Sequence, residues 1–292
     1  MKKTFVEKSP VKIFLGTVLA AAAVSVLFVS CKEKNSQKTA HKNQEKKVPK
    51  SLPVPETKVD PENIPEHSDR RIIYLTFDDG PNKGTDNLLK IIHERKVPVT
   101  SFVVGNHVYG SKAQKKQLEN LKNDSLVELA NHSYSHAENR YSEFYKNSEK
   151  VVKDFNRVKD SLKFSNSYAR TPGRNIWRTS NINETDLKSS KAAADELSRN
   201  GYKLIGWDLE WKPDQKMKLK GSHKEMLKKV DSIFLNDLEK NSRHLVFLSH
   251  DQYLTDDESV KELSLFIQEL QKTNRFEFRK LSSYPKIDAL LQ

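Results

Sequence analysis

From about residue 70 onward, short apolar runs alternate with longer segments in which apolar residues recur every three or four positions. The short runs are typical of buried strands, and the wider spacing is typical of amphipathic helices. The pattern predicts strands at 71–77, 97–104, 126–130, 168–171, 203–208, 244–249 and 276–281. It predicts helices at 85–95, 114–123, 142–163, 185–199, 223–239 and 256–273.

This regular alternation of strands and helices predicts an α/β fold, because parallel strands need a crossover between them, which is usually helical. About seven strand–helix units in one domain favour a distorted (β/α) barrel with about seven parallel strands. In such a barrel the functional side chains follow the carboxyl ends of the strands. The residues directly after each predicted strand are therefore the candidates for chemistry.

The first thirty residues follow a different pattern. Residues 1–12 carry four lysines and one glutamate, and residues 13–30 are apolar and uncharged up to Cys31. A basic start, an apolar core and a small residue before the break predict an export signal. The run LFVSC resembles a bacterial lipoprotein box, which implies a signal peptide over 1–30 and a lipidated Cys31. A retained membrane anchor and a plain cleaved signal stay open, and each of the three exports the rest of the chain.

Residues 31–68 are rich in Lys and Pro and show no apolar periodicity. Such a composition buries too little apolar surface to offset the entropy of the chain. We expect a disordered tether there, which holds a domain at 69–292 away from the membrane.

Composition narrows the classes of function. The 292 residues include 51 Lys and Arg against 39 Asp and Glu, a net charge of +12. The basic residues are spread out rather than interleaved with aromatic ones, and export conflicts with a nucleic-acid role, so we expect no nucleic-acid partner. The single Cys excludes an intrachain disulfide and a Cys-rich zinc module. We expect a monomer.

Two strand ends carry groups that suit a metal centre. The first strand runs into Asp78 and Asp79, where Gly80-Pro81 turns the chain. The third strand is followed by His132 and His136, whose spacing lets both imidazoles reach one ion. Taken alone, the first motif is ordinary turn composition and the second is more often structural.

Three further strand ends carry polar or aromatic side chains. Arg170 ends the fourth strand, Glu210 and Trp211 follow the fifth, and His250 follows the sixth. A single strand-end histidine is usually structural. Polar groups at five strand ends of one predicted barrel instead favour a catalytic site.

These motifs, in this order, resemble those of the NodB-homology polysaccharide deacetylases (carbohydrate esterase family 4). The resemblance covers about residues 70 to 292. TFDDGP at 76–81, the pair His132 and His136, and Leu-Ser-His at 248–250 match three family motifs.

Two other motifs match in part. The family's Arg-x-Pro followed by an aromatic residue is present as Arg170 and Pro172, but Gly173 stands in the aromatic position. The family's Asp-Trp is Glu210-Trp211 here. The family aromatic helps to line the sugar groove, and Trp177 is a candidate to fill the gap at Gly173.

The resemblance implies a divalent metal held by Asp79, His132 and His136. Two imidazoles and one carboxylate suit catalytic zinc, so we expect Zn²⁺, with Co²⁺ and Ni²⁺ as alternatives. Asp78 then serves as the general base, and Arg170 holds it ionised and oriented.

The remaining expected roles concern the leaving group and the sugar. His250 is the expected proton donor, kept charged by Glu210 or, alternatively, by Asp208 or Asp251. The peptide N–H of Tyr134 is a candidate oxyanion donor. The expected substrate-binding residues are Pro172, Trp211 and Leu248.

The implied activity is removal of N-acetyl groups from an envelope or extracellular polysaccharide, peptidoglycan-like or chitin-like, with release of acetate. An O-acetyl ester hydrolase of the acetyl-xylan type is the alternative enzyme, and a catalytically silent saccharide-binding lipoprotein is the alternative class. We expect an exported lipoprotein of the bacterial envelope, in the periplasm or on the cell surface, held to the membrane through Cys31.

Overall fold

The computed structural model describes residues 70–287. The predicted signal peptide at 1–30, Cys31 and the tether at 31–68 lie outside the described residues. Between residues 70 and 287, no helix has the length and apolar character needed to cross a membrane.

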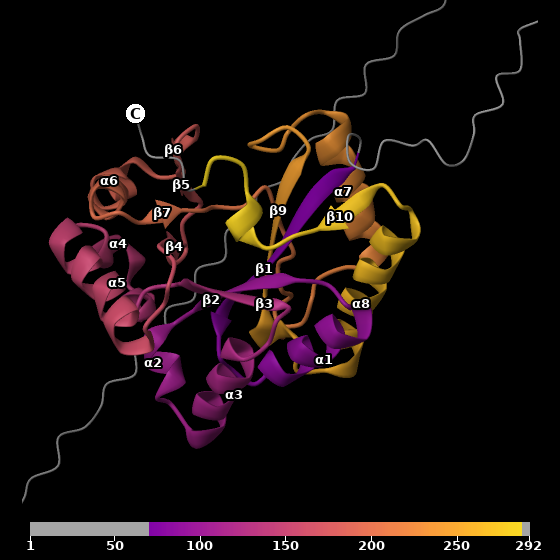
Figure 1. Cartoon of the computed structure of the whole chain (residues 1–292), viewed down its shortest axis with the longest axis horizontal. Coiled ribbons are helices and arrows are strands. Elements are labelled where there is room, and N and C mark those ends of the chain that lie inside the picture. Colours follow the sequence, from indigo (N-terminus) through magenta and orange to yellow (C-terminus); the bar gives the residue numbers. More distant parts are fainter. Residues whose placement is uncertain (1–69, 288–292) are drawn as a thin grey trace, which may run out of the picture. The chain divides into compact units, whose positions relative to one another are not determined.

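The described residues form one mixed sheet with helices around it (Figure 1). The strand order is β6-β5-β7-β4-β3-β2-β1-β9-β8, and β10 also pairs with β1. The central strands are parallel, and only the β5–β6 and β5–β7 pairings are antiparallel within the described part of the chain. The bounds are β1 Arg71–Gly80, β2 Val99–Val103, β3 Val127–Asn131, β4 Tyr168–Ala169, β5 Ile176–Arg178, β6 Asn183–Thr185, β7 Lys203–Leu204, β8 Leu209–Glu210, β9 His244–His250 and β10 Phe276–Phe278.

The predicted α/β class and distorted barrel are confirmed, since all seven predicted strands form and the sheet curls with helices outside it. The short hairpin of β5 and β6 was not predicted, because its three-residue strands are too short to show a period of two. Strands β4 and β7 are shorter than predicted because the chain leaves the sheet at Arg170 and Ile205.

The helices lie close to their predicted positions. Their bounds are α1 Thr85–Arg95, α2 Gly105–Val108, α3 Lys112–Lys122, α4 Tyr141–Phe144, α5 Ser148–Leu162, α6 Lys191–Arg199, α7 His223–Leu235 and α8 Asp257–Lys272. The single helix predicted over 142–163 is wrong, because Asn147 accepts the backbone N–H of Lys150 and so begins a separate helix, α5. The helix predicted at 185–199 begins later, since Thr185 pairs within β6.

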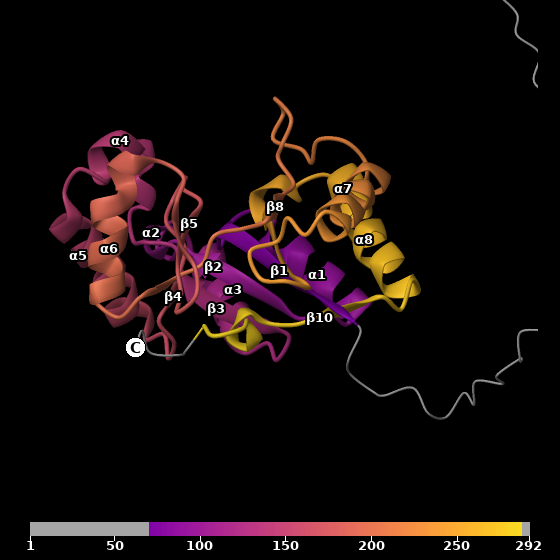
Figure 2. The same ribbon diagram turned by 90° about the horizontal axis from the view of Figure 1, so that it is seen from above.

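Burial on both faces of the sheet explains why strands such as β1 and β9 are continuous apolar runs in the sequence. Residues 72–80 of β1 and 245–249 of β9 are all buried, because neighbouring strands flank them and helices cover the sheet. Figures 1 and 2 show α5 and α6 together at one end of the sheet and α7 and α8 at the other. The adjacent order β3-β2-β1-β9-β8 brings the carboxyl ends of these strands, and the residues that follow them, to one edge.

Candidate active site

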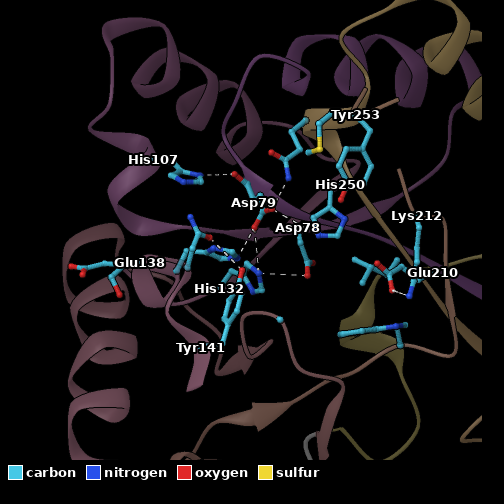
Figure 3. Close-up of a pocket in the computed structure, with 18 of the residues that line it drawn as sticks. Asp78, Asp79, His107, His132, Glu138, Tyr141, Glu210, Lys212, His250 and Tyr253 are labelled. Carbon is cyan, nitrogen blue, oxygen red and sulfur yellow. Dashed lines mark hydrogen bonds and ion pairs between the residues drawn. The ribbon is translucent and has the colours of Figure 1, made fainter. Parts of the chain in front are cut away.

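The end of β1 turns two adjacent carboxylates into one pocket. Successive residues of a strand normally point to opposite faces. Here the pairing with β2 slips between Asp78 and Gly80, and Asp79 takes a φ of 73°. This left-handed conformation in the bulge lets the side chains of Asp78 and Asp79 both line the pocket drawn in Figure 3.

The two histidines come from the loop after β3, which is not a regular helix. Ser133 and His136 both have positive φ, and His136 opens a 3₁₀ turn over His136–Asn139. The carboxylate of Asp154 accepts the backbone N–H groups of Tyr134 and Ser135 at 2.9 and 3.0 Å, which holds the loop in shape. The Tyr134 N–H is therefore already used, and its expected oxyanion role is wrong.

Asp79, His132 and His136 form a possible metal site. Their candidate ligand atoms all lie within 4.8 Å of one another. Asp79 Oδ1 is 3.1 Å from His136 Nε2 and 3.5 Å from His132 Nε2 (Figure 3). That oxygen is buried and accepts no hydrogen bond of good geometry from any described residue, so a cation facing it would satisfy it.

Neighbouring groups orient these ligands. His132 Nδ1 lies 2.9 Å from the carbonyl of Arg170, which leaves its Nε2 free toward Asp79. The other oxygen of Asp79 accepts a hydrogen bond from Gln252 Nε2 at 2.9 Å. These two contacts hold the side chains of His132 and Asp79 in place, and the sequence patterns contained no signal for Gln252.

The electrostatics favour the metal-binding protonation states of two of the three residues, His132 and Asp79. Burial lowers the pKa of His132 to about 4. Burial by itself would raise the pKa of Asp79, but the adjacent His136, His132 and His250 hold it below its ordinary value. Near neutral pH the imidazole of His132 is therefore neutral and the carboxylate is ionised, the forms that act as ligands. Burial alone would lower the pKa of His136, but the adjacent carboxylate of Asp79 raises it above its ordinary value.

Asp78 is held by Arg170, as the resemblance implies. Arg170 Nη1 donates to Asp78 Oδ1 at 2.8 Å, and both side chains are almost fully buried. The second carboxylate oxygen, Oδ2, lies 3.6 Å from His132 Nε2. Arg170 also donates to the hydroxyl of Thr76 and to the carbonyls of Ile205 and Gly206. Only the folded chain identifies these three partners.

His250 faces the same pocket from the end of β9. The register of β1 and β9 places Asp78 opposite His250, and His250 Nε2 lies 3.8 Å from Asp79 Oδ2. His250 Nδ1 is buried and has no hydrogen-bond partner among residues 70–287.

None of the three carboxylates expected beside His250 hydrogen-bonds to it. Glu210 lines the pocket and pairs with Lys212 at 3.6 Å. Asp208 accepts backbone N–H groups at 240 and 246. Asp251 accepts hydrogen bonds from Asn82 and Thr85. None of them is therefore bonded directly to His250 in the described part of the chain, and the role expected of Glu210, which shares the pocket with His250, stays a prediction.

The pocket measures about 790 Å³, which is large enough for a sugar unit. Of the expected substrate-binding residues, Leu248 lines it. Pro172 is buried and does not line it, and its carbonyl accepts the hydroxyl of Tyr145.

The sugar-facing role expected for Trp211 is wrong. Its side chain is 1% exposed, stacks edge-on against Phe266 and donates its indole N–H to the carbonyl of Lys220. Leu209 and Trp211 lie in the core while Glu210, between them, lines the pocket, because side chains of an extended segment alternate between its two faces. Trp177 is equally buried and does not fill the space at Gly173.

The sequence patterns missed other pocket residues. The further residues that line it are Asn106, His107, Ser135, Glu138, Asn139, Tyr141, Trp207, Lys212, Met217, Gln252 and Tyr253. Trp207 belongs to the same strand-end segment as Asp208 and Glu210, so its position in the sequence could have identified it as a pocket residue. Tyr141 lies five residues beyond His136, and no sequence pattern identified it as a pocket residue.

Comparison with known proteins gives a consistent picture. A family model described as polysaccharide deacetylase matches residues 66–193. The chain is 25% identical over 203 residues to the chitin disaccharide deacetylase of Vibrio alginolyticus, covering 49% of this chain and 48% of that protein. It is 36% identical over 129 residues to the peptidoglycan-N-acetylmuramic acid deacetylase PdaC of Bacillus subtilis, covering 42% of this chain and 25% of that protein. The chain spans about half the length, or less, of these curated relatives.

Solved structures share the fold. A Streptococcus mutans CE4 esterase superposes with a TM-score of 0.56 at 22% identity, covering 72% of this chain and 86% of that one. A family 4 carbohydrate esterase from Streptomyces lividans, in complex with acetate, gives a TM-score of 0.52 at 16% identity, covering 75% of this chain and 97% of that one.

Proposed function

We propose that this chain, which carries a polysaccharide deacetylase domain of the NodB-homology type, removes N-acetyl groups from an envelope or extracellular polysaccharide and releases acetate. One observation carries the proposal: the buried Asp79 faces two imidazoles, while Arg170 holds a second carboxylate, Asp78, in the same pocket. Relatives named chitin disaccharide deacetylase and peptidoglycan-N-acetylmuramic acid deacetylase support an N-acetylated glycan of the chitin or peptidoglycan kind.

Asp79, His132 and His136 would hold the metal. Two nitrogen ligands and one oxygen ligand favour Zn²⁺, with Co²⁺ and Ni²⁺ as alternatives. When bound, the metal acts as a Lewis acid toward the acetyl carbonyl and lowers the pKa of water to about 7.

Asp78 acts as the general base. Its Oδ1 is occupied by the guanidinium of Arg170, while Oδ2 lies on the side of His132. A water molecule that attacks the acetyl carbon can therefore give its proton to Oδ2. Arg170 stays protonated and keeps the carboxylate oriented, because four buried hydrogen bonds fix its guanidinium.

His250 acts as the general acid. It reaches the pocket from β9, whereas the two metal-binding imidazoles come from the loop after β3 (Figure 3). His250 would give its proton to the amide nitrogen of a substrate held in this pocket. Proton donation from the imidazole then lets the amine leave, because an amide anion is too poor a leaving group.

We also propose that Cys31 anchors the enzyme as an exported lipoprotein. The uncharged apolar run at 13–30 directly before Cys31 supports export and lipid attachment. An envelope location would place the domain beside wall polysaccharide. The monomeric state stays a prediction.

Acetate release tests the function. We expect the full-length chain to release acetate from purified wall polymer or from N-acetylglucosamine oligomers, and a chelator to abolish the release. Release from acetylated xylan alone would instead favour an O-acetyl ester hydrolase. Saccharide binding without any acetate release, with metal bound, would favour a silent binding lipoprotein.

A further inference from the structure

Gly173 lies where the family motif has an aromatic residue, and in the folded chain the ring of Tyr141 crowds that position. Gly173 has a φ of 63°, which side chains rarely adopt. A Cβ at this position would meet three ring atoms of Tyr141 at 3.0–3.1 Å. The ring of Tyr141 therefore occupies the space that a side chain at position 173 would need.

Tyr141 reaches this place from another element, since it opens α4. Its ring stands edge-on to His136, with ring centres 5.8 Å apart, and it lines the same pocket as Gly173. Figure 3 shows Tyr141 on the side of the pocket where His132 lies. The aromatic surface beside the metal site is thus provided by α4 rather than by the segment after β4.

The contacts of Tyr141 leave its ring suited to binding. The side chain is half-buried, and the guanidinium of Arg174 lies 5.8 Å from its ring centre. Among residues 70–287, its hydroxyl makes only a long hydrogen bond of 3.4 Å to Asn139. Tyr141 therefore lines the pocket with a ring that is only partly covered by its neighbours.

A second aromatic side chain, Trp207, lines the same pocket. Asn175 holds its backbone by two hydrogen bonds, one to the carbonyl and one from the N–H, at 2.8 and 3.0 Å. Rigid aromatic rings bind the apolar face of a pyranose with little loss of conformational entropy.

We propose that Tyr141 is a specificity-determining residue that packs against the pyranose ring of the acetylated sugar, in the place of the aromatic side chain missing at Gly173. This inference rests on the proposed function, because it assumes a saccharide at the metal site. It names the residue that contacts the sugar ring, and it makes the aromatic ring the required feature.

The test compares the full-length chain with its Tyr141→Phe, Tyr141→Leu and Tyr141→Ala variants. Binding of the N-acetylglucosamine tetramer is measured calorimetrically, in zinc-loaded protein that also carries Asp78→Asn so that the ligand is not consumed. KM and kcat for the same tetramer are measured without that background change. Tyr109→Ala is the matched control, because Tyr109 is 55% exposed and does not line the pocket.

We expect Tyr141→Phe to bind within about twofold of the parent, and Tyr141→Leu and Tyr141→Ala to bind about tenfold more weakly. KM should rise more than kcat falls. Tyr141→Leu fills a similar volume, so it decides the result if Tyr141→Ala does not fold. Parent-like binding by a folded Tyr141→Leu protein, checked by its melting temperature, would overturn the inference.

The binding arm separates this inference from the proposed function. Tyr141-dependent binding by a chain that releases no acetate from any glycan would keep the inference and refute the deacetylase. Acetate release together with saccharide binding that does not depend on the ring at 141 would keep the deacetylase and refute the inference. A parent chain that binds no saccharide at all would refute both.

Discussion

Replacing Arg170 with methionine is expected to destabilise the folded chain strongly. Arg170 is fully buried, and its guanidinium makes four hydrogen bonds. The acceptors are Asp78 Oδ1, Thr76 Oγ1 and the backbone carbonyls of Ile205 and Gly206, at 2.7–3.0 Å. Methionine has a similar length but cannot donate a hydrogen bond, so Asp78 would remain buried without its cation.

The magnitude follows from the burial of the pair. Removing one partner of a buried ion pair costs about 3–5 kcal/mol, because the other charge is left uncompensated. In a domain of this size each kcal/mol lowers Tm by roughly 2–4 °C, so Arg170→Met should lower it by about 10 °C. The exposed pair of Arg275 and Asp231 is the control. There, Arg275→Met should shift Tm by no more than about 2 °C.

A double-mutant cycle identifies the cause. Asp78→Asn removes the charge that Arg170→Met would strand, so the double variant should lose about 2 kcal/mol less than the sum of the single losses. Urea denaturation of the full-length chain and its three variants measures this difference. Additive losses, within about 0.5 kcal/mol, would show that the ion pair is not the source of the destabilisation and would refute the reasoning.

The remaining predictions concern the metal, the acid and the anchor. Asp79→Asn should weaken zinc binding by at least about 100-fold, whereas Asp78→Asn should keep zinc and lose turnover; metal analysis after dialysis would reject this division of roles if both variants lost zinc equally. His250→Ala should keep its zinc and lose about 10²–10⁴ in kcat for acetate release, and an unchanged kcat would exclude the role of proton donor. Cys31→Ser should abolish incorporation of radiolabelled fatty acid, and labelling that persists would contradict lipidation at that residue.

The strands and helices that were predicted well are those in which residues at a regular spacing are buried in the same way. Strands β1 and β9 are flanked by other strands and covered by helices, so nearly every position is apolar and the run is visible in the sequence. The helix α1 was predicted with its observed bounds, because one apolar stripe faces the sheet and positions beyond it are polar. The β5–β6 hairpin and the break before α5 depend on contacts and caps that leave no period.

The candidate site was likewise predicted in part from the sequence. Strand-end motifs pointed to Asp79, His132 and His136, and parallel strands must bring such residues to one edge. Among the described residues, none of the three carboxylates expected beside His250 forms a hydrogen bond with it. Spacing along the chain does not tell where a carboxylate makes its hydrogen bonds.

The sequence alone determined the kinds of groups available and that they follow the carboxyl ends of strands, since the positions of the strands along the chain are set by local pattern. Only the tertiary structure decided which face each side chain takes. The extended backbone at the end of β8 places Glu210 at the pocket and the next residue, Trp211, in the core. The tertiary structure also decided that the ring of Tyr141, 32 residues before Gly173 in the chain, lies beside Gly173. Packing between elements far apart in the chain leaves no pattern in the spacing of residues.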